Sequence, residues 1–124
     1  IHLLGYKSGE DLQREVGNAR FTVLSSEWRE NMPYSGLESL AAQTPIIGAR
    51  IGGIPELVEE GKTGFTFESG NAVDLSNSML KCAAVSALNY SAMQHSCREY
   101  VNARCLQNEY ALALIDLYER VIQR

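Results

Sequence analysis

The sequence predicts an α/β fold in which a parallel sheet is followed by a helical tail. Over residues 1–70, short segments rich in β-branched and aromatic side chains alternate with segments of helical periodicity, which is typical of parallel strands joined by helices. Over residues 71–124, no strand pattern occurs and apolar residues recur at helical spacing. We therefore divide the chain into an α/β portion, residues 1–70, and a C-terminal helical segment of the same domain, residues 71–124.

Four segments are predicted to be strands. Residues 1–6 and 45–49 are apolar runs bounded by glycine or proline, and residues 20–25 are rich in β-branched and aromatic side chains, as in a central strand. Residues 64–67 form a last short strand, which the Ser-Gly-Asn sequence at 69–71 ends.

Capping signals mark the helices of the α/β portion. Ser8 is predicted to cap a helix whose first turn is acidic. Ser35 and Glu38 have the S-x-x-E spacing of a capping box that opens a short helix. Pro55 stands at the first position of a further helix, which Gly61 is expected to end.

Apolar residues at helical spacing are expected to face the core. They are Leu12, Val16 and Ala19; Leu37, Leu40 and Ala41; and, in the tail, Leu75, Met79, Leu80 and Ala83, then Tyr90, Met93, Cys97, Tyr100 and Val101, then Tyr110, Leu114, Leu117, Tyr118 and Val121. The tyrosine, methionine and cysteine residues of the tail are therefore interpreted as core positions and not as a cofactor site.

Composition excludes several classes of protein. The chain has 124 residues, one domain or less, and a formal charge of −4, which argues against a nucleic-acid partner. No apolar run approaches the roughly 20 residues of a membrane span, and the N-terminus has no signal-peptide pattern. Cys82, Cys97 and Cys105 are odd in number and lack C-x-x-C spacing, so we expect three reduced, mostly packed thiols and neither a disulfide framework nor a zinc site.

Glu30 and Glu38, with seven residues between them, are the candidate binding carboxylates. Residues 26–34 have no periodicity and follow a predicted strand, so they form the loop at its carboxyl end, where open α/β sheets bind ligands. Ionised carboxylates accept hydrogen bonds from the vicinal hydroxyls of a sugar. The alternatives are that Glu38 only completes the capping box and that Glu30 is a solvated loop residue.

Backbone amides are the second candidate feature. Met32, Tyr34, Ser35 and Gly36 stand at a predicted helix start, where unpaired N–H groups and the helix dipole favour phosphate. Pro33 has no N–H and cannot donate. The glycine pair at 52–53 precedes the next helix and permits close approach of a ligand. The alternative is that both are ordinary loop-to-helix junctions.

Other motifs fail. The Gly-Lys-Thr sequence at 61–63 is not a P-loop, because the upstream glycine position is occupied by Glu56. His2 and His95 are far apart and have no acidic neighbourhood, so neither a metal site nor a triad is predicted. Trp28, next to Arg29, stacks against a ligand or another domain in one interpretation and packs within the fold in the other.

The ordered set of these segments resembles the C-terminal, donor-binding half of the retaining GT-B glycosyltransferases of family 4. The resemblance rests on Phe-Thr-Val-Leu-Ser-Ser at 21–26, the E-x7-E pair, the segments 37–49 and 52–58, and the W-x-E-N-x-P sequence at 28–33. It implies an incomplete Rossmann-like sheet, since two strands that would separate residues 1–6 from residues 20–25 are not in this chain. We therefore expect an exposed sheet edge that is re-paired or covered by an oligomer contact.

The resemblance also implies roles for the site residues. Glu30 is the catalytic carboxylate that contacts the donor hexose, and Glu38 binds the ribose hydroxyls. Amides of Met32, Tyr34 and Ser35, with Gly36 and the glycine pair at 52–53, surround the hexose and the diphosphate. Neither a metal nor another cofactor is implied. The departing phosphate accepts the proton of the acceptor in such enzymes, so no protein base is implied either.

The implied protein is an enzyme larger than this chain. Its partners are a nucleotide-sugar donor (a UDP- or GDP-sugar) and an N-terminal acceptor domain that is missing here, so the fragment is expected to be inactive alone. A cytoplasmic enzyme of polysaccharide or glycoconjugate synthesis, peripheral at the inner membrane when full-length, is expected. The alternatives are a non-catalytic Rossmann-like binding module and a sugar-nucleotide epimerase of GT-B architecture.

Overall fold

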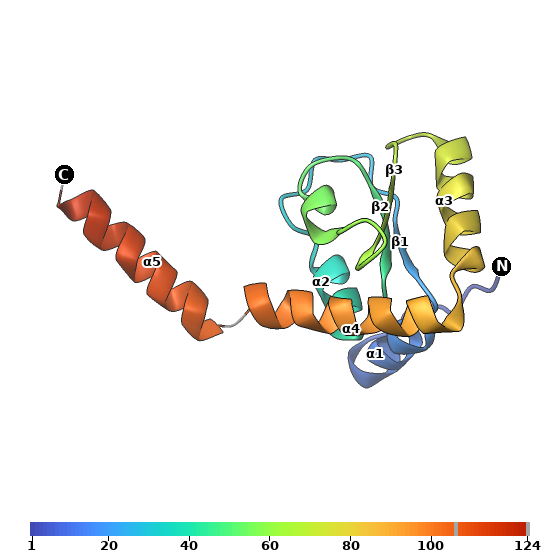
Figure 1. Cartoon of the computed structure of the whole chain (residues 1–124), viewed down its shortest axis with the longest axis horizontal. Coiled ribbons are helices and arrows are strands. Elements are labelled where there is room, and N and C mark those ends of the chain that lie inside the picture. Colours follow the sequence, from blue (N-terminus) through green and yellow to red (C-terminus); the bar gives the residue numbers. More distant parts are fainter. Residues whose placement is uncertain (106, 124) are drawn as a thin grey trace.

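The computed structural model describes residues 1–105 and 107–123. Its elements along the chain are α1 (Gly9–Asn18), β1 (Thr22–Leu24), α2 (Tyr34–Ala41), β2 (Ile46–Ala49), the 3₁₀ helix η1 (Ile54–Leu57), β3 (Gly64–Phe67), α3 (Ala72–Ala84), α4 (Ala87–Arg104) and α5 (Gln107–Ile122) (Figure 1).

The three strands form one parallel sheet in the order β1-β2-β3, which confirms the predicted α/β class with an incomplete parallel sheet. Thr22 pairs with Ile46, and Ile46 pairs with Gly64. All four residues of the central strand β2 are buried, as expected for a strand covered on both faces.

Two hydrophobic clusters lie on the two faces of the sheet, because successive side chains of β2 point in opposite directions. Ile46 packs with residues of α2, η1 and α4, namely Leu40, Leu57, Cys97 and Tyr100. Ile47 packs on the other face with Ala49, Phe67 and Cys82, the last of which belongs to α3. The sheet is therefore the middle layer between α3 on one face and α2, η1 and α4 on the other (Figure 1).

The strands predicted at 20–25, 45–49 and 64–67 are confirmed, but the strand predicted at 1–6 is wrong. Residues 1–6 form no strand and are exposed; the exposed fraction of Leu3 is 96% and that of Tyr6 is 93%. A strand forms only where its backbone groups pair with a neighbour, and this segment pairs with no strand within the described part of the chain. The predicted re-pairing of the sheet edge is wrong for the same reason, since β1 pairs with β2 alone among the described residues. An oligomer contact at that edge stays a prediction.

The capping box predicted at Ser35 and Glu38 is also wrong. The N-cap of α2 is Pro33, which is buried with extended backbone angles, so Ser35 already lies inside the first turn. Ser8 does occupy the N-cap of α1, but its side chain makes no capping hydrogen bond.

The helix predicted to run from Pro55 to Gly61 is a single 3₁₀ turn that ends at Leu57. The reason lies in Thr63, whose buried hydroxyl donates to the carbonyl of Leu57 and accepts from the N–H of Glu59. Those bonds satisfy the end of the turn and direct the chain toward β3.

The tail fits the prediction in α4 and in one residue of α3. Met93, Cys97 and Tyr100 of α4 are buried, as expected. In α3, Leu75 packs against the core as expected. The fully buried residues are Ser78 and Cys82, and the predicted Met79, Leu80 and Ala83 are exposed, so the rest of the predicted stripe is wrong.

The predicted core stripe of α5 is wrong as well. Helix α5 extends away from the body, and most of its apolar side chains are exposed (Figure 1). They include Tyr110, Leu117, Tyr118 and Val121. The expected burial therefore fails because no described element covers this helix.

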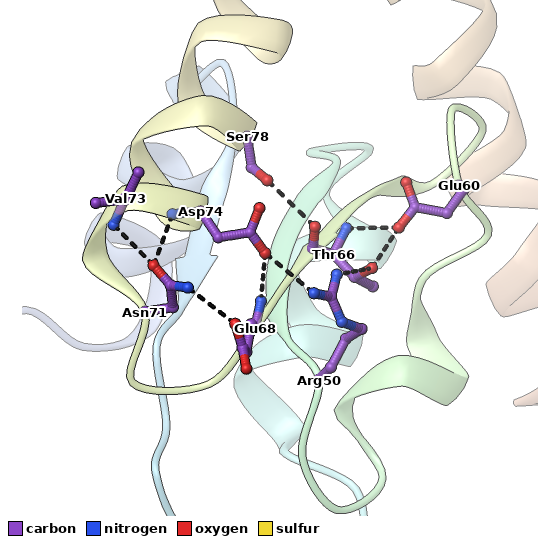
Figure 2. Close-up of polar contacts among 8 residues, drawn as sticks. All are labelled: Arg50, Glu60, Thr66, Glu68, Asn71, Val73, Asp74 and Ser78. Atoms are coloured by element: carbon purple, nitrogen blue, oxygen red, sulfur yellow. Dashed lines mark hydrogen bonds and ion pairs between the residues drawn. The ribbon is translucent and has the colours of Figure 1, made fainter.

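A polar network explains how α3 is set against the sheet (Figure 2). The carboxylate of Asp74 accepts from the N–H of Glu68 at 2.7 Å and from Arg50 at 3.0 Å, and the hydroxyl of Ser78 donates to the carbonyl of Thr66 at 3.2 Å. The side chain of Asn71 caps α3 by accepting from two amides of its first turn. The face of α3 that docks on the sheet therefore carries Leu75, Ser78 and Cys82.

Candidate functional site

The candidate site lies at the carboxyl end of the parallel strands, where three loops follow β1, β2 and β3. The loop after β1 carries Glu30, and the loop after β2 carries Gly52 and Gly53. The N–H of Gly53 donates to the carbonyl oxygen of Glu30 at 2.7 Å, so these two loops are joined directly. The structure therefore brings together Glu30 and the glycine pair that the sequence predicted as site residues.

The contact between the two loops requires glycine at positions 52 and 53. Gly52 has a φ of +56°, and a Cβ there would lie 2.4 Å from the carbonyl oxygen of Glu30. A Cβ at Gly53 would lie 1.5 Å from the carbonyl oxygen of Asn31. The close approach that these glycines permit is that of the loop bearing Glu30, and the N–H of Gly53 is engaged in it.

The Glu30 carboxylate is exposed, and among the described residues the hydroxyl of Ser26 donates to its Oε1 at 2.7 Å. The backbone carbonyl of Ser26 in turn accepts from the hydroxyl of Ser69, which follows β3, at 3.3 Å. Sequence reasoning missed both serines, because a hydrogen bond across an irregular loop leaves no periodic pattern.

The start of α2 presents the other predicted donors. Pro33 is buried at the N-cap, and the N–H of Gly36 donates back to the carbonyl of Pro33 at 3.0 Å. Tyr34 and Ser35 are the first two helical residues and are exposed, as is Met32 before them. The first N–H groups of a helix lack an intrahelical acceptor and lie at the positive end of its dipole, so Tyr34 and Ser35 are the amides placed to bind an anion.

Gly36 sets how closely α2 approaches the sheet. It is buried, and a Cβ at this position would lie 2.5 Å from Leu57 and 3.0 Å from Leu24. The backbone of α2 therefore rests directly on side chains of β1 and η1, which holds its N-terminus against the sheet.

Glu38 lines a cavity to which the loop of Glu30 does not contribute. A cavity of about 570 Å³ lies between α1 and α2, and its lining residues are Gly9, Leu12, Gln13, Val16, Gly17, Glu38, Ala41 and Ala42. Glu30 is not among these residues. The structure thus joins Glu30 to the glycine pair and directs Glu38 toward α1; a ligand shared by the two carboxylates stays a prediction.

Three large apolar side chains in the loop of Glu30 and at the start of α2 are exposed. Trp28 and Tyr34 have exposed fractions of 80% and 81%, and Met32 is half exposed. Packing of Trp28 within the described part of the fold is therefore not observed, in contrast to one of its two interpretations.

The described residues offer neither a metal site nor a helix that could cross a membrane. Residues 1–105 and 107–123 contain no group of three or more histidine, cysteine, aspartate or glutamate side chains that could hold a metal ion. None of the described helices is both long and apolar enough to cross a membrane.

Comparison with known proteins gives a family. The sequence model of the family described as glycosyl transferases group 1 matches residues 1–103. The sulfoquinovosyl transferase SQD2 of Arabidopsis thaliana is 34% identical over 73 residues, which cover 56% of this chain and 14% of that protein. The amylovoran biosynthesis glycosyltransferase AmsK of Erwinia amylovora is 28% identical over 86 residues, which cover 65% of this chain and 21% of that protein.

The fold has a solved counterpart. The structure of HepE from Anabaena in complex with UDP-glucose matches with a TM-score of 0.76 at 20% identity, over 91% of this chain and 31% of that chain. This likeness shows the fold, which is part of a GT-B glycosyltransferase. The chain therefore spans under a third of this protein and smaller shares of the two curated relatives.

Proposed function

The chain belongs to the family of glycosyl transferases group 1, and from this we propose that it is part of the donor-binding domain of a retaining, family 4 hexosyltransferase. We call the longer enzyme that contains it the parent enzyme. The proposed division is an α/β donor-binding portion, residues 1–70, and a helical segment, residues 71–124. The acceptor-binding domain belongs to other parts of the parent enzyme, and the chain alone does not turn over.

The single observation that carries the proposal is the junction of the loops at the sheet edge. The loop of Glu30, which leads into α2, is joined to the glycine loop after β2 by a hydrogen bond of 2.7 Å from the N–H of Gly53 to the carbonyl oxygen of Glu30. An exposed carboxylate next to the positive end of a helix supports binding of a ligand that carries both hydroxyl groups and a diphosphate.

In the proposed complex, the Glu30 carboxylate accepts a hydrogen bond from a hydroxyl of the donor hexose, and Glu38 binds the ribose hydroxyls. The first amides of α2 stabilise negative charge that develops on the departing diphosphate. The phosphate accepts the proton of the acceptor, so the protein contributes positioning and charge stabilisation and needs no general base. Pro33 supplies no N–H at this point, so the anion would rely on its neighbours Tyr34 and Ser35.

The proposed donor is a UDP- or GDP-sugar, used in polysaccharide or glycoconjugate synthesis. The UDP-glucose bound to HepE and the amylovoran synthesis named for AmsK support this class of donor and of product. A cytoplasmic site of action follows from the proposed donor and belongs to the same proposal. Peripheral attachment at the inner membrane would depend on the acceptor-binding domain of the parent enzyme.

A second candidate is a Rossmann-like binding module without chemistry. It is favoured by one observation, that Glu38 lines a cavity whose lining does not include Glu30. In that case, the two carboxylates do not serve one ligand.

The test uses the parent enzyme with Glu30→Gln, Glu38→Gln and, as a matched control from the same loop, Glu27→Gln. Removing one charge-assisted hydrogen bond of about 1.5–3 kcal/mol lowers kcat/KM roughly ten- to a hundredfold. We expect this loss at positions 30 and 38 and an unchanged kcat/KM at the exposed Glu27. Calorimetric titration with a panel of UDP- and GDP-sugars measures donor binding separately. Wild-type kcat/KM in both the Glu30 and Glu38 variants contradicts the proposal.

A further inference from the structure

We propose that Ser26 is a positioning residue, which holds the Glu30 carboxylate in the orientation that receives the donor sugar. The inference rests on the proposed function, because it assumes that Glu30 contacts the donor. It concerns a residue that neither the motif spacing nor the helix periodicity identifies.

The geometry at the carboxylate supports this role. The Ser26 hydroxyl lies 2.7 Å from Oε1 of Glu30 and donates to it. The Glu30 side chain is otherwise exposed, and an exposed glutamate samples several rotamers. One hydrogen bond on Oε1 selects among these rotamers and leaves Oε2 to accept from a sugar hydroxyl.

Ser26 can act as a support because it is itself fixed. It follows β1 after one intervening residue, and its side chain is half-buried. Its backbone carbonyl accepts from the hydroxyl of Ser69, in the loop that follows β3, at 3.3 Å. The loops after β1 and β3 are therefore tied together at the residue that holds the carboxylate.

The backbone of Glu30 is held independently. Its carbonyl accepts from the N–H of Gly53, in the loop that follows β2, and its own N–H donates to the carbonyl of Trp28 at 3.0 Å. The backbone of Glu30 is thus held by Gly53 and Trp28, and its side chain is held by a different residue, Ser26. Loss of the Ser26 hydroxyl is expected to free the carboxylate and to leave the loop in place, which separates positioning from folding.

The experiment measures kcat and KM of the parent enzyme for a UDP- or GDP-sugar with Ser26→Ala, Ser26→Thr, Glu30→Gln and the double variant Ser26→Ala/Glu30→Gln. We expect Ser26→Ala to lower kcat/KM about tenfold, because misplaced groups in a donor site lose rate steeply. Ser26→Thr keeps the hydroxyl and is expected to restore kcat/KM to within about twofold of wild type. In the Glu30→Gln background, Ser26→Ala is expected to cause little further loss, because the two residues act as one unit.

The outcomes separate the two proposals. Wild-type kcat/KM for Glu30→Gln removes the donor contact of Glu30 on which the inference rests, and the inference with it; the proposed function falls only if Glu38→Gln also has wild-type kcat/KM. A loss for Glu30→Gln together with wild-type kcat/KM for Ser26→Ala overturns the positioning role alone. An equal loss from Ser26→Ala in both backgrounds overturns it too, since a merely structural effect is additive. If Ser26→Ala does not fold, Ser26→Cys replaces it, because a thiol nearly keeps the volume but is only a weak donor. Ser26→Cys is then expected to lower kcat/KM as Ser26→Ala would, and wild-type kcat/KM for it overturns the positioning role.

Discussion

The amide N–H of Gly53 donates to the carbonyl oxygen of Glu30 across 2.7 Å and joins two motifs that lie 23 positions apart in the sequence. The close approach that accompanies this bond explains why a glycine stands at position 53. A Cβ there would overlap the backbone of Asn31, in the loop that carries Glu30. In this structure, the glycine motif is thus a support for the candidate carboxylate, whatever further contact it makes with a ligand.

Replacing Gly53 with alanine is expected to destabilise the chain. The new Cβ would lie 1.5 Å from the carbonyl oxygen of Asn31, so the loop of Glu30 must move, and overpacking of this kind lowers the free energy of unfolding by about 1–3 kcal/mol. Gly17→Ala is the control, because Gly17 lies in α1 and a Cβ added there would meet no atom within 4 Å. It is expected to stabilise the helix by up to about 1 kcal/mol. Urea unfolding measures both, and equal midpoints for the two variants contradict the explanation.

The strands and α4 were predictable because their signals are local. β-branched and aromatic residues mark β1, β2 and β3, and the 3.6-residue period marks the buried face of α4. The segment 1–6 has an equally apolar sequence, yet it forms no strand. Its failure shows that strand formation depends on a neighbour with which to pair, which the composition of the segment does not reveal.

The helix starts were harder to predict, because two capping signals compete within three residues. Ser35 and Glu38 match a capping box, but Pro33 has a fixed φ and takes the N-cap position first. The docking face of α3 was missed for a similar reason. Its orientation follows from the hydrogen bonds of Asp74 to Glu68 and of Ser78 to β3 together with the packing of Leu75, and it leaves Met79 and Leu80 exposed.

The candidate site was predictable in part. Spacing and resemblance predict Glu30, Glu38, the start of α2 and the glycine pair as site residues, and the structure joins Glu30 to the glycines. The support from Ser26 and Ser69 could not be predicted, because contacts between irregular loops depend on how the strands that carry them are ordered in the sheet. Whether Glu38 shares a ligand with Glu30 stays a prediction.

Acid is expected to weaken the anchor of α3 through Asp74. The N–H of Glu68 and then Arg50 hold the pKa of this carboxyl below its ordinary value of 3.8, against an opposing effect of desolvation. A carboxyl with a lowered pKa in the folded state stabilises the fold above its unfolded pKa, and this contribution is lost as the pH falls through the folded pKa. Asp74→Asn is therefore expected to be less stable than wild type at neutral pH, with the difference shrinking below about pH 3.8. Urea unfolding across this range measures it; a difference that stays constant contradicts the assignment.

The three thiols are expected to differ in reactivity. Burial raises the pKa of Cys82 to about 11 and that of Cys97 to about 12, so both stay protonated at pH values near 8, whereas Cys105 is exposed. Iodoacetamide is expected to label Cys105 first in the native chain and all three cysteines in urea, as read by mass spectrometry. Cys105→Ser is the control and is expected to remove the iodoacetamide label that is incorporated fastest. Labelling of Cys82 at the rate of Cys105 contradicts the packing of α3.

Removing the hydroxyl of Tyr100 is expected to loosen α4 from η1. Tyr100 is buried, and its hydroxyl donates to the backbone carbonyl of Glu56 at 2.7 Å, next to the apolar cluster of Ile46 and Leu57. Tyr100→Phe keeps the ring in this cluster and leaves the carbonyl without that donor, which lowers the free energy of unfolding by about 1 kcal/mol. Tyr118→Phe removes a hydroxyl from an exposed ring of α5 and is expected to change stability by less than about 0.5 kcal/mol. Urea unfolding of the two variants side by side decides the matter: if Tyr118→Phe destabilises as much as Tyr100→Phe, the bond to Glu56 does not hold α4 in place.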